Sequence, residues 1–280
     1  ESVLSCRKCR LSRFEVVIRS GNIDDDALLV LSTNRRSVEL NIRGIELDPE
    51  DACTENYELI PSTYRLFNEA TRALIPDLCH FVSAIFAEFD ALRNEDKCLL
   101  IRNYHRCFLV IDSKLRLIRR FKQGAIYRQL PTYTTYFSLD SLDQFFRDCP
   151  DQSNVKAATD MITECFLKHV PVTERHFEQI KPTDDEYMAL IGLAFWSVEN
   201  LELSDDTLLL AARYRTEIIA ELMAQYRSTI GHEKAATRIG QLLCLLQDLR
   251  RAEMSLNADG EMFRMLGAYD DDTVTYMLQV

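Results

Sequence analysis

The chain of 280 residues carries 33 Lys and Arg against 44 Asp and Glu, for a net charge of −11, and contains only 8 Gly and 7 Pro. Those two turn-forming residues make up less than half of their usual share, so collagen-like, low-complexity and many-turned all-β folds are excluded. At 47% hydrophobic residues the chain can bury a large core. Because no apolar run approaches the ~18 residues that a bilayer requires, we expect one large helical domain and no membrane span.

The charge is divided unevenly along the chain. Residues 1–20 carry five basic and two acidic residues, for a net charge of +3, and the remaining 260 residues carry −14. An acidic body repels phosphate, so any contact with nucleic acid falls to the basic N-terminal stretch. The alternative interpretation is that this stretch is a solvated tail.

Two of the nine cysteines, Cys6 and Cys9, are separated by two residues. This gap lets both thiolates reach one tetrahedral Zn²⁺ ion. A closed site needs four ligands, and no second Cys-x-x-Cys, Cys-x-x-His or His pair follows, so a redox pair is the alternative. The other seven cysteines are scattered, and we expect most of them to pack as small apolar side chains.

Helix signals dominate after a mixed first part. Residues 15–60 alternate polar stretches with short apolar clusters, and we expect a linker with one helix there. Further along, N-cap side chains predict helices that begin near Asn94, Thr183 and Ser204, because each side-chain oxygen can accept from an amide of the first turn.

The predicted helices differ in how much apolar surface they carry. Those over 94–120 and 184–197 are apolar nearly all round, so we expect them to be buried between other helices, which implies three layers. Those over 205–228 and 232–256 are amphipathic and can form outer faces or a dimer contact. Alternating β-branched and aromatic residues predict one β-ribbon over 124–137. The predicted fold is therefore all-α with one short ribbon.

Three segments of the body resemble, in order, the ligand-binding domain of the nuclear hormone receptors. Residues 89–103 look like the signature that runs from helix 3 into helices 4 and 5 of that family, residues 183–190 like helix 8, and residues 238–250 like the helix 10/11 dimerisation segment. Residues 6–14 resemble the end of the second zinc module of the family's DNA-binding domain. The likeness is greatest to the nematode-expanded supplementary receptors related to hepatocyte nuclear factor four.

The resemblance implies three parts. Residues 1–20 would be the C-terminal remnant of a zinc-finger DNA-binding domain, 21–60 a hinge, and 61–280 a ligand-binding domain folded as a three-layer antiparallel helical sandwich. Cys6 and Cys9 would hold Zn²⁺ only if upstream sequence supplies the other ligands. The residues expected to contact DNA are Arg7, Lys8, Arg10 and Arg13. We favour a truncated sequence over a receptor that lacks a DNA-binding domain.

The resemblance also places a ligand site. Arg116 lies where relatives that hold fatty acids place the arginine that faces the ligand carboxylate, a geometry that a guanidinium suits. The apolar residues expected along the ligand are Cys79, Val82, Ile85, Phe108 and Ile111. The alternative is that Arg116 belongs to a solvated basic helix end.

Two protein-binding surfaces follow from the same resemblance. In the coregulator groove, Ala84 stands where many receptors carry a clamp lysine, Arg102 matches the second basic position, and Tyr276, beside Met277, replaces the acidic clamp residue, so we expect weak binding of LxxLL peptides. The residues expected to form a homodimer or receptor heterodimer contact are Ile239, Leu242, Leu243 and Leu246. The alternative is that this stripe packs inward.

No pattern in the chain indicates an enzyme. The five histidines lie in no catalytic motif, and the acidic doublets Asp184-Asp185 and Asp205-Asp206 stand at predicted helix starts, where they favour the helix dipole. The resemblance to the nuclear hormone receptors therefore implies a nuclear, ligand-modulated, DNA-binding regulator of RNA polymerase II transcription. The alternative is a receptor-like ligand-sensing or dimerisation module without direct DNA binding.

Overall fold

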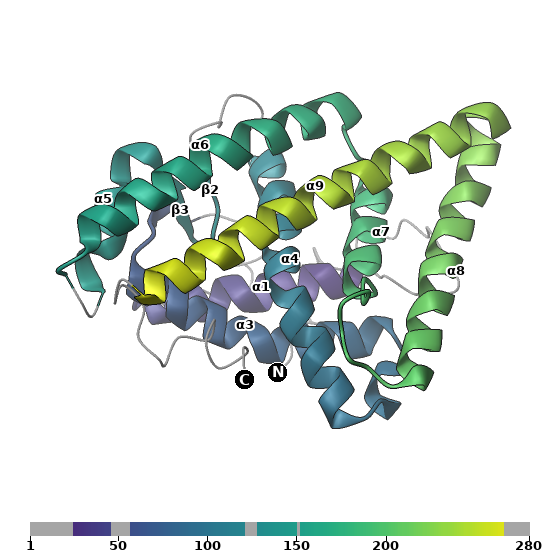
Figure 1. The fold of residues 1–280 in the computed structure, drawn as a ribbon, viewed down its shortest axis with the longest axis horizontal. Coiled ribbons are helices and arrows are strands. Elements are labelled where there is room, and N and C mark those ends of the chain that lie inside the picture. Colours follow the sequence, from purple (N-terminus) through teal and green to yellow (C-terminus); the bar gives the residue numbers. More distant parts are fainter. Residues whose placement is uncertain (1–24, 46–56, 121–127, 150–151, 266–280) are drawn as a thin grey trace.

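The computed structural model describes residues 25–45, 57–120, 128–149 and 152–265 (Figure 1). Within these ranges the chain is predominantly helical, as predicted. The α-helices are α1 (Asp25–Ile42), α3 (Tyr64–Ile85), α4 (Asn94–Arg120), α5 (Leu142–Phe145), α6 (Val155–Ile180), α7 (Asp184–Phe195), α8 (Asp205–Thr229) and α9 (His232–Met265).

The three predicted helix starts are confirmed, and the expected capping contacts are present at Thr183 and Ser204. The Thr183 hydroxyl accepts from the amide of Glu186 at 3.3 Å, and the Glu186 carboxylate accepts from the Thr183 amide at 2.7 Å, which forms a capping box at the start of α7. Ser204 caps α8 through its side chain. The helix expected over 232–256 is longer than predicted, because α9 continues to Met265.

The helices pack in three layers, as predicted. In Figure 1, α1 and α3 lie side by side along one face, α6 and α9 run together across the opposite face, α4 and α7 lie between them, and α8 lies at the edge beside α7 and α9. Helix α4 contacts α3, α7 and α9, so its residues face several neighbours in turn. This central position lets one helix contribute side chains both to the interior and to a surface pocket.

Helix α7 is buried along nearly its whole length, as its apolar sequence predicts. Every residue from Glu186 to Phe195 is buried. At its end the indole of Trp196 stacks on Tyr214 with ring centroids 4.9 Å apart, and Phe86 stacks on Phe195 at 5.3 Å. These aromatic contacts join α3, α7 and α8 into the main core.

The described strands are short and form one sheet in the order β1-β3-β2. Strand β2 (Arg128–Gln129) pairs antiparallel with β3 (Thr135–Ser138), within the stretch where a ribbon was predicted. Strand β1 (Ile60–Pro61) pairs parallel with β3, which the sequence did not indicate. The first residues of the predicted ribbon, 124–127, lie outside the described residues.

In the described part of the expected linker over residues 21–60, a helix is present as predicted, but it packs into the domain. Helix α1 lies against α3, and its Arg35 and Glu39 side chains are buried. The Arg35 guanidinium donates to the carbonyl oxygen of Ala70 at 2.6 Å, and the Glu39 carboxylate accepts from the amides of Tyr133 and Thr134 at 3.1 and 2.8 Å. The linker expectation is therefore wrong for residues 25–42, since charged residues there bury themselves against internal partners.

Within the described ranges, none of the helices combines the length and the apolar character that crossing a membrane requires.

Candidate functional site

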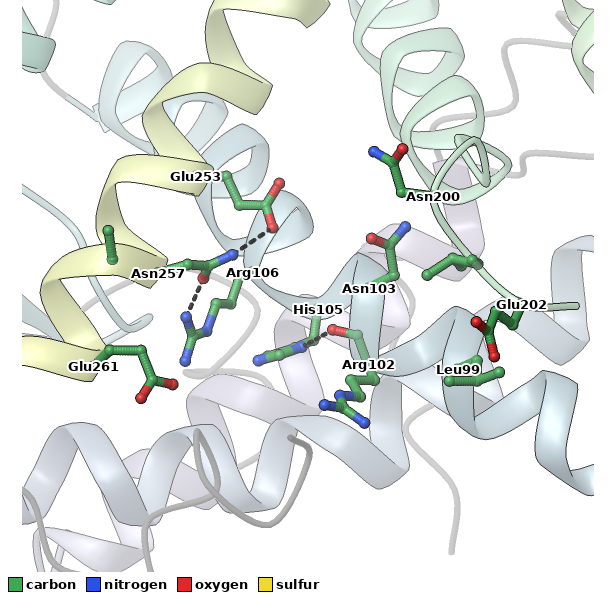
Figure 2. A pocket seen from close by; sticks show the side chains of 12 residues that line it. Leu99, Arg102, Asn103, His105, Arg106, Asn200, Glu202, Glu253, Asn257 and Glu261 are labelled. Atoms are coloured by element: carbon green, nitrogen blue, oxygen red, sulfur yellow. Dashed lines mark hydrogen bonds between the residues drawn. The ribbon is translucent and has the colours of Figure 1, made fainter. Parts of the chain in front are cut away.

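A polar pocket of about 680 Å³ opens between the first half of α4, the loop that follows α7, and the second half of α9 (Figure 2). This volume lies within the usual range for small-molecule sites. The charged and amide side chains that line it are Arg102, Asn103, His105 and Arg106 from α4, Asn200 and Glu202 from the loop, and Glu253, Asn257 and Glu261 from α9.

His105 forms the floor of this pocket. Its side chain is 4% exposed, and its Nδ1 lies 2.7 Å from the carbonyl oxygen of Arg102. Because a carbonyl oxygen only accepts, Nδ1 is assigned the proton and Nε2 keeps its lone pair. Burial, together with the nearby charge of Arg106, lowers the pKa of His105 to about 4. The imidazole is therefore neutral at neutral pH.

A chain of hydrogen bonds connects one wall of the pocket to the centre of the fold. The Arg106 guanidinium donates to the Asn257 side chain, whose amide donates to the Glu253 carboxylate at 3.1 Å. Glu253 also pairs with Arg250 at 3.2 Å, and Arg250 donates to the carbonyl oxygen of Ala194 at 2.6 Å, close to the end of α7. The pocket wall is thus fixed to the buried helix.

The structure places Arg116 at the other end of α4, among internal partners. Its Nε donates to the Asp112 carboxylate at 2.8 Å, and its terminal nitrogens donate to the carbonyl oxygens of Thr132 and Leu130 at 2.5 and 3.0 Å. The guanidinium also lies over the ring of Tyr133, 4.2 Å from the centroid. The side chain is 11% exposed, so the alternative interpretation as a solvated helix end is wrong.

The charge of Arg116 is retained in spite of burial. Burial alone lowers the pKa of the guanidinium, but the adjacent Asp112 carboxylate, together with Tyr133 and Glu39, outweighs that effect, and the net shift of the pKa is upward. The neighbouring Lys114 is also buried and pairs with Glu174, and there burial prevails and lowers the pKa of the lysine. Near the basic end of α4, Lys114 and Arg116 are therefore paired charges held inside the fold.

The apolar residues predicted to line a ligand lie together in the main core. Val82, Ile85, Phe108 and Ile111 are buried there, and Cys79 is half-buried against the same cluster. Phe81 and Phe108 connect α3 to α4 with ring centroids 5.9 Å apart. These residues therefore share one place in the interior, none of them lines the polar pocket, and their contact with a ligand stays a prediction.

The four residues predicted for dimerisation do not share one exposed face. Ile239, Leu242 and Leu246 are buried in the main core, and Leu243 alone of the four is exposed, at 40%. The inward-packing alternative is thus correct for three of them, because an amphipathic helix turns its apolar stripe toward the core.

The other predicted site residues divide between exposed and undescribed positions. Ala84 is exposed near the end of α3, and Arg102 lines the polar pocket. The predicted zinc, DNA and C-terminal groove residues, namely Cys6, Arg7, Lys8, Cys9, Arg10, Arg13, Tyr276 and Met277, lie outside the described residues. Inside the described ranges, no three His, Cys, Asp or Glu side chains are grouped so that they could hold a metal ion.

The match to a known family covers most of the chain. The sequence model described as the ligand-binding domain of nuclear hormone receptor matches residues 62–266. The chain belongs to the nuclear hormone receptor family. This assignment confirms the predicted resemblance and agrees with the three-layer helical fold.

Two curated relatives from Caenorhabditis elegans are similar to this receptor chain. The High zinc activated nuclear receptor protein is 23% identical over 207 residues, which cover 73% of this chain and 49% of that protein. The nuclear hormone receptor family member nhr-43 is 19% identical over 242 residues, which cover 84% of this chain and 53% of that protein. The chain thus spans about half the length of these relatives, and the link to hepatocyte nuclear factor four stays a prediction.

Sequence reasoning missed the polar pocket and the anchoring role of Glu39. His105 and Arg106 were passed over because the histidine belongs to no catalytic motif. A usable signal was present, since Arg102, His105 and Arg106 are spaced three and four residues apart and so share one face of a helix. The spacing cannot show that Asn257 and Glu261, about 150 residues later, close the same pocket.

Proposed function

We propose that this chain is the ligand-sensing part of a nuclear, DNA-binding receptor that regulates transcription by RNA polymerase II. The observation that supports this proposal is the family match over residues 62–266, on a fold with the same three helical layers. An apolar small molecule would bind within the core that contains Val82, Ile85, Phe108 and Ile111. Members of the family act by coupling such a ligand to coregulator proteins and to receptor dimers.

DNA binding in this proposal belongs to the N-terminal residues. Cys6 and Cys9 have the spacing of two thiolate ligands of one zinc ion, and Arg7, Lys8, Arg10 and Arg13 provide positive charge beside them. Zinc would order this module, as it does in structural zinc sites whose folding depends on the metal. The acidic body would not approach phosphate without it.

The proposed ligand need not be a fatty acid. A carboxylate that reached Arg116 would have to compete with Asp112 and with the carbonyl oxygens of Leu130 and Thr132. Because Asp112 already neutralises the guanidinium, an uncharged apolar ligand suits this interior better than an acid.

A tethered reporter assay tests the proposal. The whole chain would be fused to a DNA-binding domain of known specificity, and we expect reporter transcription to differ from that given by the tether alone. The matched controls are Leu190→Asp, which places a charge in the buried α7, and Ala220→Asp at an exposed position of α8. We expect Leu190→Asp to abolish the effect and Ala220→Asp to keep it. A reporter level equal to the tether alone, with the fusion present and folded, contradicts the proposal.

A further inference from the structure

The turn that joins β2 to β3, residues 130–134, is bonded to charged side chains from two helices. From α4, the Arg116 guanidinium donates to the carbonyl oxygens of Leu130 and Thr132. From α1, the Glu39 carboxylate accepts from two amides of the same turn, at 3.1 and 2.8 Å. The β2–β3 turn therefore connects α1 to α4 through hydrogen bonds to charged groups.

Two further side chains hold the same turn. Arg43, just after α1, donates to the carbonyl oxygen of Thr134 at 3.2 Å, and the Tyr57 hydroxyl donates to that of Tyr133 at 3.0 Å. Thr132, Tyr133 and Thr134 are each 3% exposed or less. Because water cannot readily replace a hydrogen bond that is lost in a buried place, displacing the β2–β3 turn would leave several polar groups unsatisfied.

The docking of α1 depends on this turn. The helix buries the side chains of Leu28, Leu31 and Leu40, but it also buries those of Arg35 and Glu39. Arg35 bonds to α3, whereas Glu39, besides pairing with Arg35, bonds to the β2–β3 turn. A buried charge is tolerated only while its partners are in place. A shift of the turn would take two donors from the Glu39 carboxylate and so favour release of the helix.

We propose that the β2–β3 turn couples α1 to Arg116, so that a change in the contacts of Arg116 inside the fold alters how firmly α1 is docked. Coupling of this kind is reciprocal, so the docking of α1 also stabilises the surroundings of Arg116. Helix α1 is the described helix nearest in sequence to the residues to which the proposed function assigns DNA binding. The coupling connects that helix to the interior of the domain. It goes beyond the proposed function and does not require a ligand.

Amide hydrogen exchange of the whole chain, measured by mass spectrometry, tests the proposal. Arg116→Lys keeps a cation beside Asp112 but lacks the planar fork that reaches two carbonyl oxygens, so it loosens the turn while it keeps the charge. Residues 94–105, in the first half of α4, serve as the internal reference for global unfolding. Relative to them, we expect exchange in α1 to become faster by about tenfold, since the loss of a buried hydrogen bond to a charged group makes local opening easier.

Arg238→Lys is the matched control. Arg238 also bonds to a carboxylate, that of Glu186, and to two carbonyl oxygens, those of Ile180 and Lys181. None of these partners belongs to α1 or to the β2–β3 turn, so we expect exchange in α1 to match that of the wild-type chain relative to the same reference. Exchange in α1 that is unchanged in Arg116→Lys, or raised equally in Arg238→Lys, would overturn the proposal.

Glu39→Gln tests the reverse direction. The variant keeps one acceptor oxygen but loses the charge that strengthens both bonds to the turn. We expect exchange in the second half of α4, residues 112–118, to become faster relative to residues 94–105. An unchanged ratio between the two halves of α4 would contradict the reciprocity on which the proposal depends.

Discussion

The two ends of α4 carry the same kind of residue in opposite surroundings. At one end, Arg116 is buried against a carboxylate, two carbonyl oxygens and an aromatic ring. At the other, Arg102 and Arg106 line an open polar pocket beside His105. Both halves of the helix carry arginines. Tertiary contacts therefore decide whether an arginine is enclosed in the interior or lines a pocket at the surface.

The largest expected effect on stability comes from replacing the buried Arg116. Arg116→Ala leaves the Asp112 carboxylate, 3% exposed, without its cation, and we expect the free energy of unfolding to fall by about 3–5 kcal/mol. Urea unfolding followed by circular dichroism measures the loss. The control is Arg119→Ala, because Arg119 is 52% exposed and pairs with the exposed Asp184, a contact worth about 1 kcal/mol or less. A cost for Arg116→Ala no larger than for this control contradicts the structural role of Arg116.

An intermediate effect on stability is expected from lowering the pH, through His105 in the polar pocket. His105 titrates near 6.5 in the unfolded chain and at about 4 in the folded chain, so between these values the unfolded chain binds a proton that the folded chain excludes. Stability therefore falls as the pH is lowered from about 6.5 toward 4, by about 2 kcal/mol at about pH 5. Urea unfolding at about pH 7 and about pH 5 measures this loss.

The matched variant isolates the contribution of His105 from that of the carboxylates, which titrate in the same range. His105→Gln keeps a polar side chain but cannot take up the proton, so its stability should depend less steeply on pH than that of the wild-type chain. Equal pH dependence in the two proteins would show that His105 is not held neutral by burial.

The smallest effect is expected from the pocket arginine. Arg106 is half-buried and its guanidinium bonds to Asn257, so Arg106→Ala should lower the free energy of unfolding by about 1 kcal/mol or less. The same urea titration compares it with Arg116→Ala. A loss as large as that of Arg116→Ala would remove the contrast between the two ends of the helix.

The part of this structure that the sequence predicts is the part that local chemistry determines. Helix α4 was expected over 94–120 and is observed over those residues, because continuous apolar periodicity needs no distant partner. The capping box at Thr183 was read from the sequence for the same reason. The three-layer arrangement followed from two helices that are apolar on every side.

The remainder depends on contacts between residues far apart in the chain. The place of Arg116 in the helix over 94–120 was predicted, but its surroundings were not. Its carbonyl partners, Leu130 and Thr132, come from the loop between β2 and β3, which only the folded chain brings to it. Ile239 and Leu242 form a regular apolar stripe, and a stripe alone does not show whether it faces the core or a second molecule. Helix α1 was read as a linker because Arg35 and Glu39 look solvated when their partners are not visible.

Helix α1 also distinguishes the region that matches the family from the folded body of the chain. The family match begins at residue 62, whereas the folded body begins at least as early as α1, whose Arg35 pairs with Asp77 and bonds to the carbonyl oxygen of Ala70. The region that matches the family and the folded body of this receptor therefore begin at different residues. Within the matched region, α3 and the segment before β3 carry a surface that receives a helix lying outside the residues the family model matches.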